Sequence, residues 1–506
     1  MRQINSHRCA AALIVFTSLS AAILSACGSS DPGTSAAPSA STRTITLSFP
    51  GGTGPLATAI VPAFHAAAIA LEEPSDVDAL EPSASAHLSP HTQRVPAILS
   101  QLSTRRLSRE VIDSVLQGGD VPAEHHVSTD TAQGITPASA TGTLVTTFTP
   151  AQLRAAYNLP AFPAPGTTLT SAQAAALGAG QTIYIVDAGL DANAATELAY
   201  FSTKFGLPQC ATASALSAKT ALPLPPQSAT SGCTFLQVYA SPTGTLTAAA
   251  PAVLDGWGLE TALDIEASHA IAPLARIVLV EAVDNQNSNL LAAISLANSM
   301  GPGVVSMSFA GPEDPMLSQF DATVFSGANM TYLASTGDSG AGVAWPAVSA
   351  KVIGVGGTTL AYDGINPRTE TLWTGTGGGV SAFTALPSYQ NISSVLGMFP
   401  AKGRIVADVS MDADPNSGLD IVYYPLASST SGSWVAAGGT SLSSPLWAGL
   451  LAAANAERAA SHELPLGDAH TVLYSVAQSS LSFGASIFDI KAGANGGCAV
   501  CNATIG

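Results

Sequence analysis

From about residue 148 onward, the chain alternates short apolar runs with longer alanine-rich stretches. Five apolar runs are typical of buried strands that end in polar or glycine turns: QTIYIVDAGL, ARIVLVEAV, GVVSMSFA, MTYLASTGDSG and KVIGVGGTTL. Helix-like segments lie between several of them. Strands that alternate with helices build parallel sheets, so the pattern predicts an α/β fold with a doubly wound, mostly parallel sheet. Functional groups should gather at the carboxyl ends of its strands.

The amino-terminal part has a different pattern. Residues 1–27 carry Arg2 and Arg8, then an apolar stretch, and end in LSAC, which resembles the bacterial lipoprotein box. We predict a lipoprotein-type signal peptide at 1–27, with membrane attachment through a lipid on Cys27. An ordinary secretory signal is the alternative. In both cases the protein is exported, as a cell-envelope lipoprotein or as a secreted protein.

Three further regions follow the signal. Residues 28–43 form a low-complexity tether, and residues 44–143 form a separate amino-terminal region that includes a run with helical spacing, AILSQLSTRRLSREVIDSVLQ. Residues 144–506 hold the α/β pattern and form the main domain. No later apolar run is long and uniform enough to predict a membrane span.

Composition narrows the class of function. The 506 residues include 17 Lys and Arg against 34 Asp and Glu, for a formal net charge of −17. Such an acidic chain argues against nucleic acid as a partner. Few basic residues also mean little positive self-repulsion once carboxylates are protonated, which fits an acidic working medium.

The cysteines fit an exported protein. Outside the signal they fall into two local pairs, Cys210 with Cys233 and Cys498 with Cys501, for which we predict disulfides. The CAVC spacing of the second pair would also suit metal or redox chemistry. No second pair with that spacing exists to complete a zinc site.

Ser441 is the candidate nucleophile. It stands in GGTSLSSPLW, on a glycine-rich turn before an apolar run that could begin a helix. A seryl hydroxyl needs a base within hydrogen-bond reach and a donor for the oxyanion. Of the nine histidines, only His269, His462 and His470 fall in the α/β region, and none has the H-G-T context of subtilisin-like enzymes. His269 lies near a predicted helix end, where a structural role is expected.

Carboxylates offer another base. Glu260 and Asp264 are four residues apart, which on a helix places both on one face. An acidic surface edge would have the same spacing, but the neighbouring side chains are apolar. Two buried carboxylates couple, so that Glu260 can act as base with Asp264 as its orienting partner. Asp338 follows the strand MTYLA, and a protonated aspartate there can donate a hydrogen bond to an oxyanion.

Taken together, these segments resemble the sedolisins, the serine-carboxyl peptidases with a subtilisin-like fold. The resemblance runs from about residue 148 through TPAQLRAAYNLP, ETALDIEASHAIAP, VVSMSFAGPE, STGDSG, VIGVGGTTL, GGGVSAF, DVSMDADPNSG and GGTSLSSPLWAGL. It implies an acid-active endopeptidase that acts on proteins or peptides. In this enzyme Ser441 is the nucleophile, Glu260 the general base, Asp264 its positioning partner and Asp338 the oxyanion donor.

The resemblance also carries departures. The family often has tryptophan at the position of Phe309 and proline at that of Ala407. It has an amino-terminal prosegment that is cut away, a position that residues 28–143 occupy here, with a cut expected within about ten residues of Thr143. It further implies calcium, with a carboxylate from Asp489 and the backbone carbonyl of Ile490. The later aspartate that normally completes the ligands does not follow, so the expected site is incomplete.

Two other functions stay open at this stage. One is a subtilisin-like peptidase that uses Asp187 with a histidine. The other is a non-catalytic surface lipoprotein that retains the fold. The sequence says nothing of substrate side-chain preference or oligomeric state.

Overall fold

The computed structural model describes most of the chain from Gly54 onward. The described residues are 54–67, 69, 71–74, 90–96, 99, 107, 109–120, 144–164, 166–213, 216–396, 401–425, 431–478 and 487–495. The predicted signal peptide, the tether, Thr143 and the pair Cys498 and Cys501 lie outside them.

A ten-stranded sheet forms the centre of the fold. Its main path runs β15 (Thr369–Leu372), β14 (Ile353–Ala361), β12 (Met330–Ser335), β10 (Gly303–Met307), β5 (Thr182–Ala188), β9 (Arg276–Ala282), β7 (Thr234–Ala240), β6 (Ala211–Thr212). Off this path, β18 (Val409–Asp412) pairs with β14 and β8 (Leu246–Thr247) with β7. Only β15 and β8 pair antiparallel. The predicted doubly wound, mostly parallel sheet is therefore confirmed.

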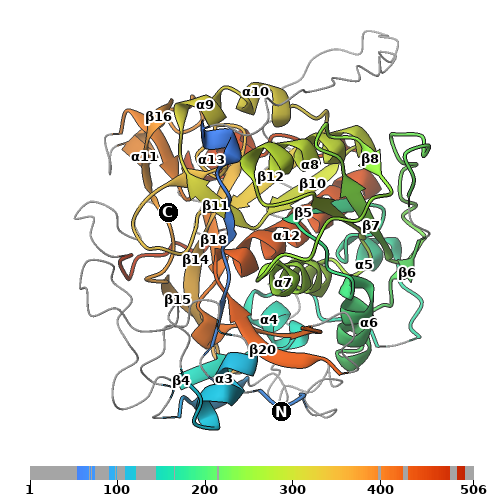
Figure 1. Ribbon diagram of the computed structural model, residues 1–506, viewed down its shortest axis with the longest axis vertical. Helices are drawn as coiled ribbons and strands as arrows, with labels where there is room; N and C mark the ends of the chain where they lie inside the picture. Colours follow the sequence, from blue (N-terminus) through green and yellow to red (C-terminus); the bar gives the residue numbers. More distant parts are fainter. Residues whose placement is uncertain are drawn as a thin grey trace, which may run out of the picture.

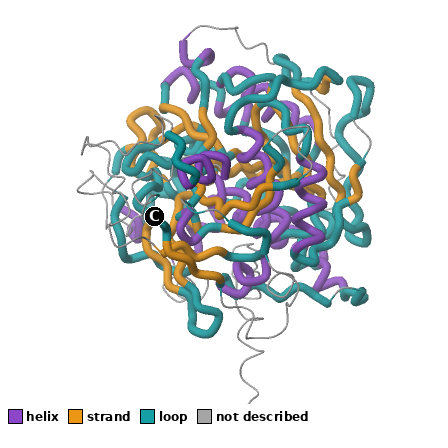
Figure 2. Tube along the Cα trace, turned by 60° about the horizontal axis from the view of Figure 1, so that its bottom comes forward, coloured by secondary structure: helices purple, strands orange, loops and turns teal. Residues whose placement is uncertain are grey.

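Helices cover both faces of this sheet (Figures 1 and 2). Alternate residues of β5 show the division: Tyr184 and Val186 join a core cluster with α8 (Asn287–Met300), while Ile183 and Ile185 join one with α6 (Ala194–Lys204), α7 (Trp257–Ile271) and α12 (Thr440–Ala460). Because successive side chains of a strand point to opposite faces, a wholly apolar strand needs apolar helices on both sides.

Shorter elements surround the sheet. The helices are η1 (Gly54–Ala57), α3 (Arg109–Leu116), α4 (Pro150–Ala156), α5 (Ser171–Ala175), α9 (Pro315–Ser318), α10 (Asp321–Val324), α11 (Ser393–Leu396), η4 (Pro415–Ser417) and α13 (His470–Gln478). The strands are β1 (Val61–Pro62), β2 (His65–Ala66), β3 (His91–Arg94), β4 (Leu144–Thr147), β11 (Phe309–Pro312), β13 (Ala344–Trp345), β16 (Gly379–Ala385), β17 (Gly403–Val406), β19 (Leu419–Tyr423) and β20 (Ser433–Gly438). They form the small sheets β1-β11-β13, β19-β20-β2, β16-β17 and β3-β4.

The described residues before 144 pack against the main domain. Leu56 and Ile60 are buried in the same core cluster as α8, β1 pairs with β11, and β2 pairs with β20. In Figure 1 this blue segment runs past β11 toward β20. Residues 54–67 are thus part of the folded unit described here. The predicted boundary at residue 143 stays a prediction.

The helix α12 begins one residue before Ser441, and its first turns are held by an unusual set of partners. Pro445 lies inside the helix and has no N–H to give to the carbonyl of Ser441, four residues earlier. That carbonyl instead accepts a hydrogen bond from the Ser308 hydroxyl at 3.4 Å. Pro445 therefore leaves the Ser441 carbonyl available to Ser308, the residue that follows β10.

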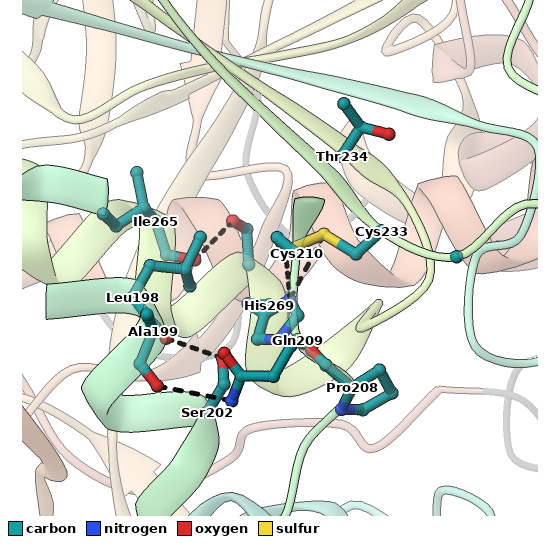
Figure 3. The surroundings of a disulfide bond; sticks show 12 residues. Leu198, Ala199, Ser202, Pro208, Gln209, Cys210, Cys233, Thr234, Ile265 and His269 are labelled. Atoms are coloured by element: carbon teal, nitrogen blue, oxygen red, sulfur yellow. Dashed lines mark hydrogen bonds between the residues drawn. A yellow bond between two sulfur atoms is a disulfide. The ribbon is translucent and has the colours of Figure 1, made fainter. Parts of the chain in front are cut away.

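A disulfide joins Cys210 and Cys233, as the sequence predicted, with the two Cα atoms 4.4 Å apart. His269 lies beside it (Figure 3), with Nδ1 3.7 Å from the Cys210 sulfur and a ring nitrogen 3.0 Å from the carbonyl oxygen of Pro208. Burial lowers the pKa of His269 to about 4. The expected structural role of His269 is consistent with these contacts.

Reducing the disulfide should destabilise the protein. The bond closes a loop of sequence separation 23, and closing such a loop restricts the unfolded chain by roughly 3 kcal/mol. We expect the double variant Cys210→Ala and Cys233→Ala to lose about that much free energy of unfolding in urea titrations. A reductant should lower the melting temperature of the wild type and leave that of the variant unchanged. Equal stability of both proteins would contradict the prediction.

Candidate active site

Ser441 is fully buried at the start of α12. Its hydroxyl donates a hydrogen bond to the backbone carbonyl of Ser308 at 3.2 Å. It also lies close enough to the carboxyl group of Glu260 to lower that group's pKa. The predicted helix is present, but it starts at Thr440, so Ser441 lies in its first turn and not on the glycine turn before it; β20 ends at Gly438.

Glu260 and Asp264 lie on α7, and neither is exposed to solvent. Burial, then the charge of Asp264, then that of Asp187 raise the pKa of Glu260 well above its usual range; the Ser441 hydroxyl acts in the opposite direction. Burial and then the charge of Asp187 raise the pKa of Asp264 in the same way, opposed by the Ser308 hydroxyl. The two carboxyl groups predicted to share a helix face do so, and they face the serine.

A third carboxyl group, from Asp187 at the end of β5, joins this pair. Burial and the charge of Asp191 raise the pKa of Asp187 to about 7, while the nearby Thr261 hydroxyl acts in the opposite direction. Sequence analysis considered Asp187 only as partner of a histidine. Its position at the carboxyl end of a central strand, where ligands and catalytic groups gather, was the signal available.

The backbone N–H of Ser441, at the start of α12, points toward the carbonyl oxygen of Ala63. The Ser441 N–H donates to the carbonyl oxygen of Ala63 at 2.9 Å. A Cβ added at Gly439 would lie 2.3 Å from that oxygen and 2.5 Å from Asp338 Oδ2, so both oxygens flank one point. Gly439 has φ +93° and leaves this space open. The arrangement is that of an oxyanion site, a backbone donor opposite an acidic side chain.

Asp338 follows β12 and is held by the residue before the serine. Its Oδ1 accepts hydrogen bonds from the backbone N–H of Thr440 at 2.8 Å and from the Thr440 hydroxyl at 2.7 Å. This leaves Oδ2 toward Ala63 and toward His65, whose Nε2 is 3.5 Å away. Asp338 is thus held next to the residue that precedes Ser441.

Comparison with known proteins gives the same picture. The chain is 34% identical over 223 residues to kumamolisin of Bacillus sp. (strain MN-32), which is 39% of this chain and 39% of that protein. It is 34% identical over 165 residues to sedolisin of Pseudomonas sp. (strain 101), covering 30% and 25% of the two chains. Over the matched part, the chain is similar to the peptidases of the sedolisin family. The matched part spans about two-fifths of the length of kumamolisin.

Two further findings agree with this family. A model of the subtilase family matches residues 244–472, from the turn between β7 and β8 to the start of α13. The solved structure of Pseudomonas sedolisin, described as a serine-carboxyl proteinase complexed with two molecules of pseudo-iodotyrostatin, covers 70% of this chain and 91% of its own. Its TM-score is 0.51 at 23% identity, and this likeness shows the fold.

The structure brings together all four side chains that the sedolisin resemblance pointed to. Ser441 and Glu260 adjoin, Asp264 lies behind Glu260, and Asp338 lies at the oxyanion side. Phe309, which stands where the family often has tryptophan, is buried and packs against Trp257 with ring centroids 6.4 Å apart.

Sequence analysis missed two residues of this candidate active site, Ser308 and His65. Ser308 connects the candidate nucleophile to β10, because its backbone carbonyl accepts a hydrogen bond from the Ser441 hydroxyl. Its own hydroxyl is near enough to the Asp264 carboxyl group to lower the pKa of that group. Its place in the motif VVSMSFAGPE was the available signal. His65 comes from the amino-terminal region and is buried against Asp338 and Trp373, with ring centroids 5.3 Å apart in an edge arrangement. Nothing local in the sequence marks it.

The three histidines that sequence analysis placed in the α/β region lie away from the serine. His269 follows Glu260 by nine residues on α7, roughly 13 Å along the helix axis. His470 contacts Asp468 at 2.6 Å and the carbonyl oxygen of Val352 at 3.1 Å, at the start of α13. His462 follows the end of α12, 21 residues from Ser441.

The described residues do not form a complete calcium site. The carboxylate of Asp489 pairs with the ammonium group of Lys491 at 3.1 Å, and Ile490 is buried. Within the described ranges, the one grouping of three His, Cys, Asp or Glu ligand atoms is Cys210, Cys233 and His269, where the cysteines are joined to each other. Calcium needs six to eight oxygens, so Asp489 and Ile490 stay a predicted, partial ligand set.

Calcium should therefore stabilise this chain little. A bound ion stabilises a fold only when its concentration exceeds its dissociation constant, and one carboxylate with one carbonyl binds weakly. We expect the same melting temperature in millimolar calcium and in chelator. A rise of several degrees in calcium, lost in Asp489→Asn, would contradict this and indicate further ligands.

The buried carboxyl groups predict that stability falls as pH rises. Burial, above all, raises the folded-state pKa of Asp187 to about 7 and of Glu281 to about 8, from unfolded values of 3.8 and 4.5. As pH rises above about 4, the unfolded chain releases these protons before the folded chain does, so the free energy of unfolding falls by about 1.4 kcal/mol per pH unit for each group. Asp408 and His269 act the other way. Asp408, whose pKa Arg404 lowers against the effect of burial, does so below pH 4. His269, whose pKa burial lowers from 6.5 to about 4, does so between these two values and offsets the decline from only one of the carboxyl groups.

We expect a higher melting temperature at pH 4 than at pH 8, measured by calorimetry at constant ionic strength. Glu281→Gln should flatten the decline, because it removes one of the titrating groups. The fold should tolerate this change, because a glutamine oxygen can still accept the hydrogen bonds that the Asp191 N–H and the Gln237 amide donate to Glu281. An exposed acidic residue, Asp363, provides the matched control, Asp363→Asn. A melting temperature that rises from pH 4 to pH 8 would refute the prediction.

Proposed function

We propose that this chain is an exported serine-carboxyl endopeptidase that hydrolyses peptide bonds in acid, with proteins or peptides as substrates. The observation that carries the proposal is that Ser441, at the start of α12, and Glu260, on α7, are both fully buried, with the Ser441 hydroxyl near enough to the Glu260 carboxyl group to lower its pKa. A serine at a helix start that adjoins a carboxyl cluster, with a backbone N–H beside it, has the nucleophile, base and oxyanion donor that acyl transfer requires.

In this proposal Ser441 Oγ attacks the carbonyl carbon of the substrate, and its proton passes to Glu260. The oxyanion is stabilised by the Ser441 N–H, at the positive end of the α12 dipole, and by Asp338. Glu260 then gives the proton to the leaving amine, and a water that Glu260 deprotonates hydrolyses the acyl-enzyme.

Glu260, Asp264 and Asp187 repel one another when charged, so they titrate as a group. Burial and this repulsion raise their pKa values, so in acid Glu260 accepts the serine proton only in the fraction of molecules whose cluster carries a negative charge. A histidine would be protonated in the same acidic range and could not accept the serine proton. Asp338 donates to the oxyanion only while it holds its own proton, which limits activity as pH rises.

The predicted location of the protein is the cell envelope or the exterior. The predicted signal at 1–27, with Cys27 as lipid attachment site, supports export, and the Cys210–Cys233 disulfide fits an oxidising compartment. None of the helices within the described ranges combines the length and the apolar character that crossing a bilayer requires.

The test is hydrolysis of casein from pH 2.5 to 7.5, after acid incubation of the full chain. We expect a maximum in acid. Ser441→Ala and Glu260→Gln should nearly abolish turnover, the latter because an amide of the same shape cannot accept the serine proton. Asp338→Ala should lose about 10²–10³ in kcat, the effect of removing one oxyanion donor in comparable enzymes.

Two histidine variants serve as controls. His269→Ala should keep the pH profile, because His269 lies at the disulfide. His65→Ala tests the histidine nearest the site, which contacts Asp338. If Glu260→Gln retained turnover while either histidine variant lost it, the enzyme would be of the histidine-based type. If folded wild type never hydrolysed casein at any pH, and no change in the amino-terminal region restored activity, the non-catalytic alternative would hold.

A further inference from the structure

The cleft in front of Ser441 is occupied by the chain itself. Residues 60–67, which we call the cleft segment, run between β11 and β20, and the residues from Phe64 to Ala67 are almost fully buried. Together with β11 and the loop from Thr336 to Ala344, the residues around Ala63 line a cavity of about 270 Å³. No sequence motif singled this segment out.

The segment binds on both sides of one peptide bond. On the amino side, Val61 pairs with Ala310 and Pro62 with Phe309, antiparallel. On the carboxyl side, Ala66 pairs with Ala437, and the Ala67 N–H donates to the Ala436 carbonyl at 2.9 Å. An extended chain that adds a strand to exposed sheet edges is a common mode of peptide recognition. The Ala63–Phe64 bond lies between the two paired stretches.

At this bond the backbone meets the proposed catalytic groups. The carbonyl oxygen of Ala63 accepts from the Ser441 N–H at 2.9 Å, and the Ala63 N–H donates to the Ser308 carbonyl at 3.2 Å. The same Ser308 carbonyl accepts from the Ser441 hydroxyl at 3.2 Å. Ala63 is therefore fixed through both its N–H and its C=O, with its carbonyl group beside Ser441 and its oxygen at the proposed oxyanion site.

We propose that the Ala63–Phe64 peptide bond is an internal substrate that the chain cuts itself, in cis. The proposal rests on the proposed function. Ser441 Oγ bonds to the carbonyl carbon of Ala63 and its proton goes to Glu260; the carbon–nitrogen bond to Phe64 breaks, and Glu260 returns the proton to the nitrogen. Water then hydrolyses the ester, which leaves a carboxyl group on Ala63 and a new amino terminus at Phe64.

Geometry favours a cut within one molecule over a cut between two. Holding the reacting carbon beside the nucleophile converts a bimolecular step into a unimolecular one, worth effective molarities far above any protein concentration. The cleft segment also excludes other substrates from the same position for as long as it stays. The cut frees the amino side of the cleft, since Ala63 is then no longer joined to the buried residues that follow.

The experiment follows the purified full chain at pH 4, with mass spectrometry and amino-terminal sequencing of the products. We expect a fragment that begins at Phe64, formed with a half-time that stays constant over a tenfold dilution. Ser441→Ala should not form it. Phe64→Pro, which turns the bond into a tertiary amide, should slow its formation at least tenfold. Phe488→Pro, the same change at an exposed phenylalanine outside the cleft, should cut like the wild type.

Several results would overturn the proposal. Casein hydrolysis by a chain whose Ala63–Phe64 bond stays intact would do so, as would a cut near Thr143 without one after Ala63. A half-time that shortens with concentration would show a cut between molecules. The variant Ala63→Asp puts a charge in a buried position and should displace the cleft segment. It therefore separates failure of the self-cleavage proposal from failure of the proposed function. If only this variant hydrolyses casein, the segment is an inhibitor that is not cut, and the proposed peptidase function stands. If neither hydrolyses casein, both proposals fail.

Discussion

The site depends on the close packing of α12 against α7. Gly449 of α12 lies so near α7 that a Cβ there would be 2.6 Å from the Cβ of Ile271. This approach brings the start of α12, with Ser441, to the first turns of α7, with Glu260 and Asp264. Any larger side chain at Gly449 would separate the two helices and with them the nucleophile from its base.

The same contact explains the unusual electrostatics. Both helices cover one face of a sheet whose strands are apolar on both sides, so the carboxyl groups between them have no access to solvent. Burial raises their pKa values, and their mutual repulsion raises them further. A site of this kind holds protons at a pH where exposed carboxylates have lost theirs, and the fold that buries it is expected to be most stable in acid.

The cleft segment adds a second constraint. Its paired strands, β1 and β2, are only two residues each, yet they hold the backbone between β11 and β20, beside the start of α12. The proposed oxyanion site therefore holds a peptide carbonyl, that of Ala63. This is the arrangement that a substrate would need, supplied by the chain itself.

The sequence by itself determined the sheet and the residue types that we propose as catalytic. A buried parallel strand must be apolar throughout, and a helix places residues four apart on one face, so β5, β9 and the Glu260–Asp264 pair follow from local rules. The tertiary structure alone decided that Asp187 joins this pair, that His65 contacts Asp338, and that Ala63 lies at Ser441. These contacts join positions 73 to 378 residues apart in the chain. No periodicity or short motif carries information over such distances, because these contacts arise only when separate elements pack around a common core.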